Sequence, residues 1–269
     1  MRPTNLVKLM LVMCSLLLSA CGMAQDQPPP KQHVTLKLGQ QSEDSFRKAH
    51  AHVDDVTAPS DVVGFMELNW PARQLGTVTI DHGGHQINFP HTIFALGSSW
   101  PDYPEEGVTG LALHTGITAP EYVRHEEAWE KWQALLKHVQ ENGWQGMIYD
   151  YNARVLGVEA YNYTMSNKIS NGVNIDPSYD LNYVQWQDLL NKESSLAVYF
   201  YQDGAYLSLL LSKEIVTEDQ LAAKKLDLNL DEWGQYTIMV DFYTVRYSAR
   251  NAMLSTLPRN DDDTETELK

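Results

Sequence analysis

Hydrophobic and polar residues alternate along several short stretches of this chain, and this period of two predicts β-strands. The stretches with this pattern are residues 33–39, 61–70, 106–116 and 235–249. Two longer stretches predict β-hairpins, because strand-like segments flank a short turn. These are residues 77–90 around Gly83-Gly84, and residues 194–214 around Asp203-Gly204.

One long segment, "TAPEYVRHEEAWEKWQALLKHVQENGW", predicts a helix. Thr118 can cap its start, Pro120 suits its first turn, and Gly143 can end it. Its apolar residues recur at helical spacing and form one stripe: Val123, Trp129, Trp132, Leu136 and Val139. Two tryptophans on such a stripe could bind a ligand, but such stripes usually belong to a core, so we expect this helix to pack on the sheet. A shorter helix is predicted over residues 182–193, and strand and loop over residues 146–163.

Strands outnumber helices in this pattern and occur as hairpins, which is typical of an α+β fold. We expect a largely antiparallel sheet with the long amphipathic helix packed on one face. Residues 33–255 are predicted to form a single domain, and two sub-lobes that divide near residues 165–180 are the alternative. Residues 21–32 are predicted to be a tether stiffened by consecutive prolines, and residues 256–269 an acidic, disordered tail.

The N-terminus carries a different pattern. Arg2 and Lys8 precede the apolar run Leu9–Leu18, which small residues follow. The run is too short to span a bilayer, since a permanent helix needs roughly 20 apolar residues. A positive start, a short apolar run and small residues are typical of a secretory signal, here residues 1–20.

The end of this signal, Leu18-Ser19-Ala20-Cys21, resembles the lipobox of bacterial lipoproteins. The resemblance implies that the Cys21 sulfur receives a diacylglycerol, that the chain is cleaved before Cys21, and that the new amino group is acylated. Gly22 follows in place of an aspartate, which implies sorting to the outer membrane, facing the periplasm. A plain cleaved signal is the alternative. Cys14 is lost with the signal, so this interpretation leaves no free thiol.

The chain is acidic, with a formal net charge of −15. Removal of residues 1–20 leaves 249 residues with 18 Lys and Arg against 35 Asp and Glu, a balance of −17. Such a charge disfavours nucleic acid, whose phosphates require basic patches. It suits a basic protein partner, although an acidic balance also serves the solubility of an exported protein.

Two histidine pairs are the candidates for a metal site: His50 with His52, and His82 with His85. The second pair flanks a predicted turn, which can bring both rings to one side. A metal site needs three or four ligands, and neither pair shows a third by spacing. Polar turn residues and an exposed helix end explain them as well, so we expect no metal and no cofactor.

No motif for catalysis stands out. Ser98 and Ser99 lack the G-x-S-x-G turn of an α/β-hydrolase, and no glycine-rich phosphate loop is present. Glu126, Glu127 and Glu130 fit the solvated face of the long helix. We therefore expect a protein that is not an enzyme.

Aromatic residues are abundant, with 7 Trp, 14 Tyr and 6 Phe. The segments "VYFYQDGAY" and "VDFYTVRY" carry several tyrosines, which at loop tips or on a sheet face commonly serve recognition. The candidate partner-binding residues are Tyr199, Tyr201, Asp203 and Tyr206. Half-buried tyrosines of amphipathic strands are the competing interpretation.

An anchored, acidic, aromatic-rich α+β domain resembles the periplasmic immunity lipoproteins of type VI secretion systems. That resemblance implies a protein that neutralises an incoming toxin, often a lipase or cell-wall hydrolase, by plugging its active site. A non-enzymatic envelope assembly or structural lipoprotein is the second hypothesis, and an envelope hydrolase the third.

Overall fold

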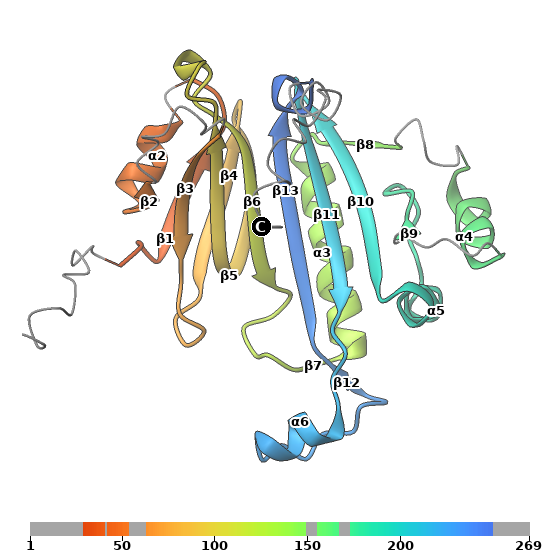
Figure 1. Ribbon diagram of the computed structural model, residues 1–269. Helices are drawn as coiled ribbons and strands as arrows, with labels where there is room; N and C mark the ends of the chain where they lie inside the picture. Colours follow the sequence, from red (N-terminus) through yellow and green to blue (C-terminus); the bar gives the residue numbers. More distant parts are fainter. Residues whose placement is uncertain (1–28, 41, 54–62, 149–154, 167–172, 250–269) are drawn as a thin grey trace, which may run out of the picture.

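The computed structural model describes residues 29–40, 42–53, 63–148, 155–166 and 173–249 (Figure 1). The predicted signal with its lipobox, most of the tether and the predicted acidic tail lie outside these residues. The described chain forms a mixed α/β structure around one large, mostly antiparallel sheet. Within these residues, no helix is long and apolar enough to cross a membrane.

The large sheet runs through eight strands in spatial order: β1 (His33–Lys37), β4 (Gly76–His82), β5 (His85–Ser99), β6 (Val108–Gly116), β13 (Tyr236–Thr244), β11 (Ala205–Lys213), β10 (Ser195–Gln202) and β8 (Gln145–Met147). Three strands pair beside this path: β3 (Gly64–Asn69) with β5, β2 (His52–Val53) with β3, and β9 (Val173–Asn174) with β10. Two pairs are parallel, β1 with β4 and β9 with β10. A separate two-stranded sheet joins β7 (Val123–Arg124) to β12 (Trp233–Gly234).

The helices connect and flank these strands. They are α2 (Glu43–Lys48), the short 3-10 helix η1 (Pro104–Glu106), α3 (His125–Glu141), α4 (Gly157–Ser166), α5 (Tyr183–Glu193) and α6 (Glu218–Ala223). The predicted helix over residues 182–193 is confirmed as α5, and Asn182 caps it by accepting a hydrogen bond from the Gln185 N–H.

Both predicted hairpins are confirmed. The turn between β4 and β5 is Gly83-Gly84, with φ of 62° and 91°. The turn between β10 and β11 is Asp203-Gly204, with φ of 41° and 79°. Two consecutive residues with positive φ give a hairpin turn the twist that its strands need, which is why glycine and aspartate serve here.

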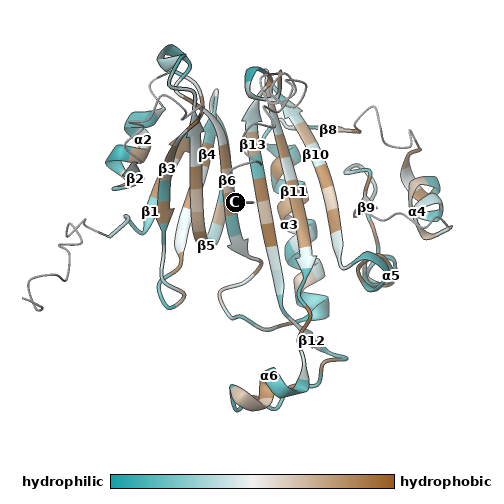
Figure 2. Cartoon of the chain, viewed as in Figure 1, coloured by the Kyte–Doolittle hydropathy of each residue, from teal (hydrophilic) through white to brown (hydrophobic). Residues whose placement is uncertain are grey.

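The sheet has its apolar core on one face. Along β13, Tyr236, Ile238, Val240 and Phe242 are buried, while the residues between them are half-buried or exposed. Figure 2 shows the same alternation of hydrophobic and hydrophilic colour along the neighbouring strands. The predicted period of two therefore sets which residues of each strand enter the core.

The long helix begins later than predicted. It starts at His125, because Val123 and Arg124 form β7 and pair with Gly234 and Trp233 instead. Pairing with a strand more than a hundred residues away overrides the local helical pattern. The predicted end is right, since the helix stops before Gly143, whose φ is 89°.

Two other expectations need correction. The last strand ends at Thr244 and not at residue 249, because the chain turns into a short helical segment over residues 245–249. The Thr244 hydroxyl accepts a hydrogen bond from the Tyr247 N–H at that turn. Part of the segment 146–163, expected as strand and loop, belongs to α4, which spans Gly157–Ser166.

Within the core, His125 is buried with only 3% of its surface exposed. Its Nε2–H donates to the Leu230 carbonyl at 3.1 Å, and its Nδ1 accepts from the Tyr236 hydroxyl at 2.7 Å. In the neutral ring, one nitrogen serves as a donor and the other as an acceptor. Burial lowers the pKa of His125 below its ordinary value of 6.5, and the nearby Lys213 acts in the same direction.

This pair predicts a pH dependence of stability. Because the folded state disfavours the charged ring, the unfolded chain binds the proton more readily. Proton binding therefore stabilises the unfolded state relative to the folded state, and increasingly so as the pH falls below 6.5. The free energy of unfolding of the wild type should therefore rise as the pH approaches 6.5 from below and gain nothing from His125 above it. Denaturant titrations of the wild type and His125→Gln at several pH values measure this. An equal pH slope in the two proteins would contradict the assignment.

Candidate protein-binding face

Four tyrosines form a row across the face of the sheet opposite its core. Tyr201 on β10 lies directly across from Tyr206 on β11, and Tyr206 across from Tyr243 on β13. The ring centroids are 5.4 Å and 5.5 Å apart in these two pairs, and Tyr247 follows at 6.0 Å from Tyr243. We call Tyr201, Tyr206, Tyr243 and Tyr247 the tyrosine row.

The period of two explains why the row stands on this face. Phe200, Leu207 and Phe242 each neighbour a member of the row in sequence, and all three are buried in the core. Side chains one residue further along the strand point to the opposite face. The row is accordingly half-buried to exposed, and Tyr201 has 38% of its surface accessible.

A glycine lets the row continue beyond β13. Tyr243 lies across from Gly110 on β6, and the Tyr247 ring covers this glycine. A Cβ at Gly110 would stand 3.1 Å from the ring, closer than nine in ten real contacts, so the ring would have to shift by a few tenths of an ångström to admit it. The Trp100 ring, which is buried, lies 6.1 Å from the Tyr247 ring and packs behind this end of the row.

A carboxylate lies beside the row. Asp241 faces the same side two residues before Tyr243, with Ser208 and Ala112 across from it on the neighbouring strands. It is half-buried, and burial raises its pKa above the ordinary value. Among the described residues Asp241 has no ion-pair partner. Met239, which is next on this face, is 48% exposed.

The hairpin tip holds one end of the row in place. The Tyr201 hydroxyl accepts a hydrogen bond from the Gly204 N–H at 3.1 Å, which fixes the ring against the turn. Asp203 supplies the turn conformation, and its carbonyl accepts from His82 Nε2 at 3.1 Å. Of the predicted partner-binding residues, Tyr201 and Tyr206 thus lie within the row, Tyr199 lies across from Ser208 on the same face, and Asp203 lies at the tip.

Both histidines of the predicted second pair have roles between segments far apart in sequence. His85 Nδ1 donates to the Asn142 carbonyl at 2.7 Å, at the end of α3. The Gln202 amide donates to His85 Nε2 at 3.1 Å. His82 and His85 thus tie the β4–β5 hairpin to the β10–β11 hairpin and to α3.

The first histidine pair lies elsewhere. His50 has φ of 66° and its Nδ1 lies 3.1 Å from the Pro29 carbonyl. His52 is on β2, across from Glu67. Within the part of the chain that the structure describes, no group of three or more His, Cys, Asp or Glu side chains is placed to hold a metal ion.

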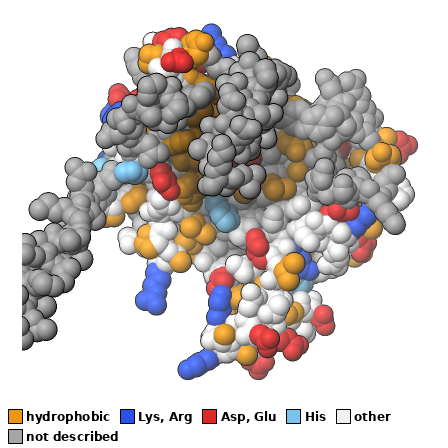
Figure 3. Space-filling view, viewed as in Figure 1, with side chains coloured by type: hydrophobic (Ala, Val, Ile, Leu, Met, Phe, Trp, Pro, Cys, Tyr) orange, Lys and Arg blue, Asp and Glu red, His pale blue; other side chains and the backbone are white. Residues whose placement is uncertain are grey.

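Acidic side chains gather at one end of the molecule. Glu218 and Asp219 open α6, and Asp227, Asp231 and Glu232 follow before β12. Figure 3 shows acidic side chains at the lower end of the molecule, with Lys and Arg side chains near them. The acidic charge adds to the acidic balance of the whole chain and favours approach of a basic protein.

Sequence reasoning missed part of this site. Asp241, Tyr243 and Tyr247 lie in the noted segment "VDFYTVRY", but the register that brings them beside Tyr206 and Gly110 is a tertiary feature. The spacing of Asp241 and Tyr243 was the one usable signal, because residues two apart share a strand face. Comparisons with protein-family models, with curated proteins and with solved structures gave no match for this chain.

The histidine contacts predict a loss of stability on truncation. His85→Ala removes two hydrogen bonds and leaves the Asn142 carbonyl and the Gln202 amide without this partner. We expect the free energy of unfolding to fall by about 1–3 kcal/mol. Chemical denaturation monitored by tryptophan fluorescence measures the change. His33→Ala, at an exposed histidine on β1, should shift stability by less than about 0.5 kcal/mol, and an equal effect of both variants would contradict the role of His85.

Proposed function

We propose that this chain is a lipid-anchored periplasmic protein that binds a protein toxin through its tyrosine row and neutralises it by occlusion. The observation that carries this proposal is the partly exposed tyrosine row beside a half-buried carboxylate. Tyrosines bury a large area on binding and lose little conformational entropy. Asp241 offers a cationic side chain of the partner an anion that is already partly removed from water.

We infer further that α3 packs on the core face of the sheet, opposite the tyrosine row. Trp132, Leu136 and Val139 of α3 share one buried cluster with Val240 and Phe242 of β13, which supports this arrangement. So does Figure 1, where α3 runs behind β11 and β13. With the helix on the core side, the row faces outward.

The charge of the chain favours a basic partner. The predicted mature chain carries a balance of −17. Complementary charge raises the association rate, so a protein entering the periplasm would be captured faster. The toxin we propose therefore presents basic and apolar side chains around its active site.

The proposed lipid anchor determines how far from the membrane the toxin would be bound. Lys31, close to the first described residue, lies ten positions after Cys21, and a fully extended chain spans roughly 3.3 Å per residue. The domain would thus stay within about 33 Å of the membrane surface. Several acyl chains hold a protein firmly where a single one is marginal.

The anchor can be tested at one residue. Cys21→Ser should prevent lipidation, because the serine oxygen does not replace the sulfur as acyl acceptor. The variant should leave the outer-membrane fraction, and mass spectrometry of the wild type should show a mature chain that starts at acylated Cys21. A membrane-bound, unmodified Cys21→Ser protein would contradict the anchor.

The binding face can be tested with the product of an adjacent toxin gene. Tyr201→Ala with Met239→Ala removes exposed contact area from the face. We expect at least about tenfold weaker binding, since truncated aromatic anchors commonly cost more than 1 kcal/mol each. Calorimetric titration of the chain without residues 1–21 measures the affinity, and survival of cells that produce the toxin measures protection.

A matched control uses exposed apolar residues away from this face. Val184 on α5 and Ile215 are 63% and 83% exposed, so Val184→Ala with Ile215→Ala removes similar side chains elsewhere. This control should bind as the wild type does. If the Tyr201/Met239 and Val184/Ile215 variants bind the toxin with equal affinity, the tyrosine row is not the binding face. If deletion of the gene leaves toxin sensitivity unchanged but damages the envelope without toxin, the neutralising function is wrong and an assembly role takes its place.

A further inference from the structure

The edge of the sheet at β1 is open on one side. The Gln32 carbonyl accepts from the Thr77 N–H, and β1 continues beside β4 in parallel register from this point. Backbone groups of alternate residues in a strand point to opposite sides, so Val34 and Leu36 bond to β4. The N–H and carbonyl groups of the residues between them point away from β4. Among the described residues, no backbone group pairs with Thr35 on that side.

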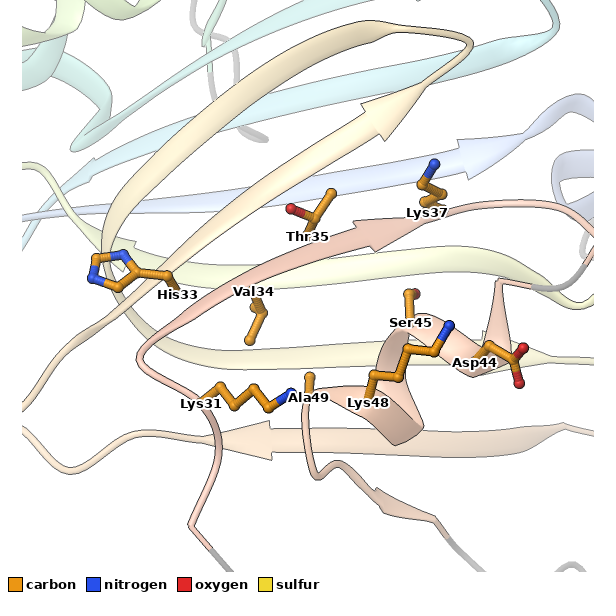
Figure 4. Close-up of a pocket in the computed structure, with 9 residues that line it drawn as sticks. All are labelled: Lys31, His33, Val34, Thr35, Lys37, Asp44, Ser45, Lys48 and Ala49. Carbon is orange, nitrogen blue, oxygen red and sulfur yellow. The ribbon is translucent and has the colours of Figure 1, made fainter.

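A groove runs along this open edge. It lies between β1 and α2, has a volume of about 370 Å³, and includes Thr35 of the strand and Ser45 of the helix. Figure 4 shows the strand and the helix on its two sides. One end is closed where the Lys31 N–H donates to the Ala49 carbonyl at 3.2 Å.

The groove is basic, in contrast to the acidic chain as a whole. Lys31, Lys37 and Lys48 line it, with Asp44 as the acidic residue on its wall. Lys37 pairs with Asp81 on β4 at 3.1 Å. Within the described part of the chain, neither Lys31 nor Lys48 has an ion-pair partner. Figure 4 shows Lys31 ending beside Ala49 and Lys48 extending from α2 in the direction of β1.

We propose that this groove binds an extended acidic peptide segment of a partner protein, which adds a strand to β1. The free backbone groups of Thr35 would give main-chain hydrogen bonds, as in other cases where a peptide extends a sheet edge. Lys31 and Lys48 would meet the carboxylates of the segment. The site is separate from the tyrosine row, so the two surfaces can be occupied by different proteins or by two parts of one.

Lysines at a sheet edge have another established role, which is to prevent edge-to-edge aggregation. The two roles predict different effects when the lysines are removed. If the lysines prevent aggregation, their removal leads to self-association of the protein. If they form a binding site, their removal weakens binding of an acidic peptide. The backbone gives a second distinction, because strand addition needs the Thr35 N–H and attraction by charge alone does not.

The experiment uses the chain without residues 1–21 and a fluorescent peptide of alternating Glu and Val. Its neutral counterpart has Gln in place of Glu, and a third peptide carries N-methyl groups on alternate backbone nitrogens. Lys31→Ala with Lys48→Ala is compared with Lys137→Ala with Lys225→Ala, at exposed lysines elsewhere. Thr35→Pro removes the outward N–H without breaking the β4 ladder, and Thr35→Ala keeps that N–H.

We expect fluorescence anisotropy to show that the wild-type chain binds the acidic peptide. The affinity should be at least about tenfold weaker in the Lys31/Lys48 variant and in Thr35→Pro. It should change by less than about twofold in the two controls, the Lys137/Lys225 variant and Thr35→Ala. The Gln and N-methylated peptides should bind at least about tenfold more weakly. The N-methylated peptide keeps the test valid if Thr35→Pro does not fold.

Three results would overturn the proposal. Equal binding of the acidic and Gln peptides would exclude recognition of carboxylates. Unchanged affinity of the N-methylated peptide would exclude strand addition. Binding to phosphatidylglycerol vesicles through Lys31 and Lys48, with no binding of the acidic peptide, would make the groove a lipid phosphate site. Because the tyrosine row is intact in these variants, toxin binding measured in parallel separates this proposal from the proposed function.

Discussion

The hydrogen bonding of β13 to two neighbours is the interaction on which the structure depends. Within the described residues β13 is the last strand in sequence, and in the sheet it lies between β6 and β11. On the β6 side lie β5, β4 and β1, and on the β11 side lie β10 and β8. Without it the sheet would divide into two parts. Its register with β11 also places Tyr243 beside Tyr206 and Asp241 beside Ser208, so the same pairing builds the core face and the candidate binding face.

The two hairpin tips reinforce this arrangement. His82 and His85 flank the β4–β5 turn. His82 contacts the Asp203 carbonyl, and His85 contacts the Gln202 amide and the Asn142 carbonyl at the end of α3. The histidines that were candidates for a metal site, His82 and His85, thus contact the hairpin tip that contains the candidate binding residue Asp203. The Tyr201 ring is held at the same tip. Hydrogen bonds that hold a side chain in place before binding favour recognition, because less entropy is lost when a partner binds.

The two surfaces proposed for binding differ in physical character. The tyrosine row and Asp241 offer aromatic area with a negative charge, whereas the β1 groove offers unpaired backbone groups with positive charge. The first suits a basic, apolar protrusion and the second an extended acidic segment. One partner that carries both kinds of segment could occupy both surfaces at once, since linked binding sites raise the effective concentration of each partner.

The sequence by itself determined the elements with strong local signals: both hairpins, the strand faces, α5 and the end of α3 at Gly143. A period of two and residues that tolerate positive φ act over a few positions, so they can be recognised locally. The tertiary structure alone decided the start of α3, where Val123 pairs with Gly234, and the row that joins Tyr201 to Tyr247. Strand order and register depend on contacts between distant segments, and no local pattern encodes them.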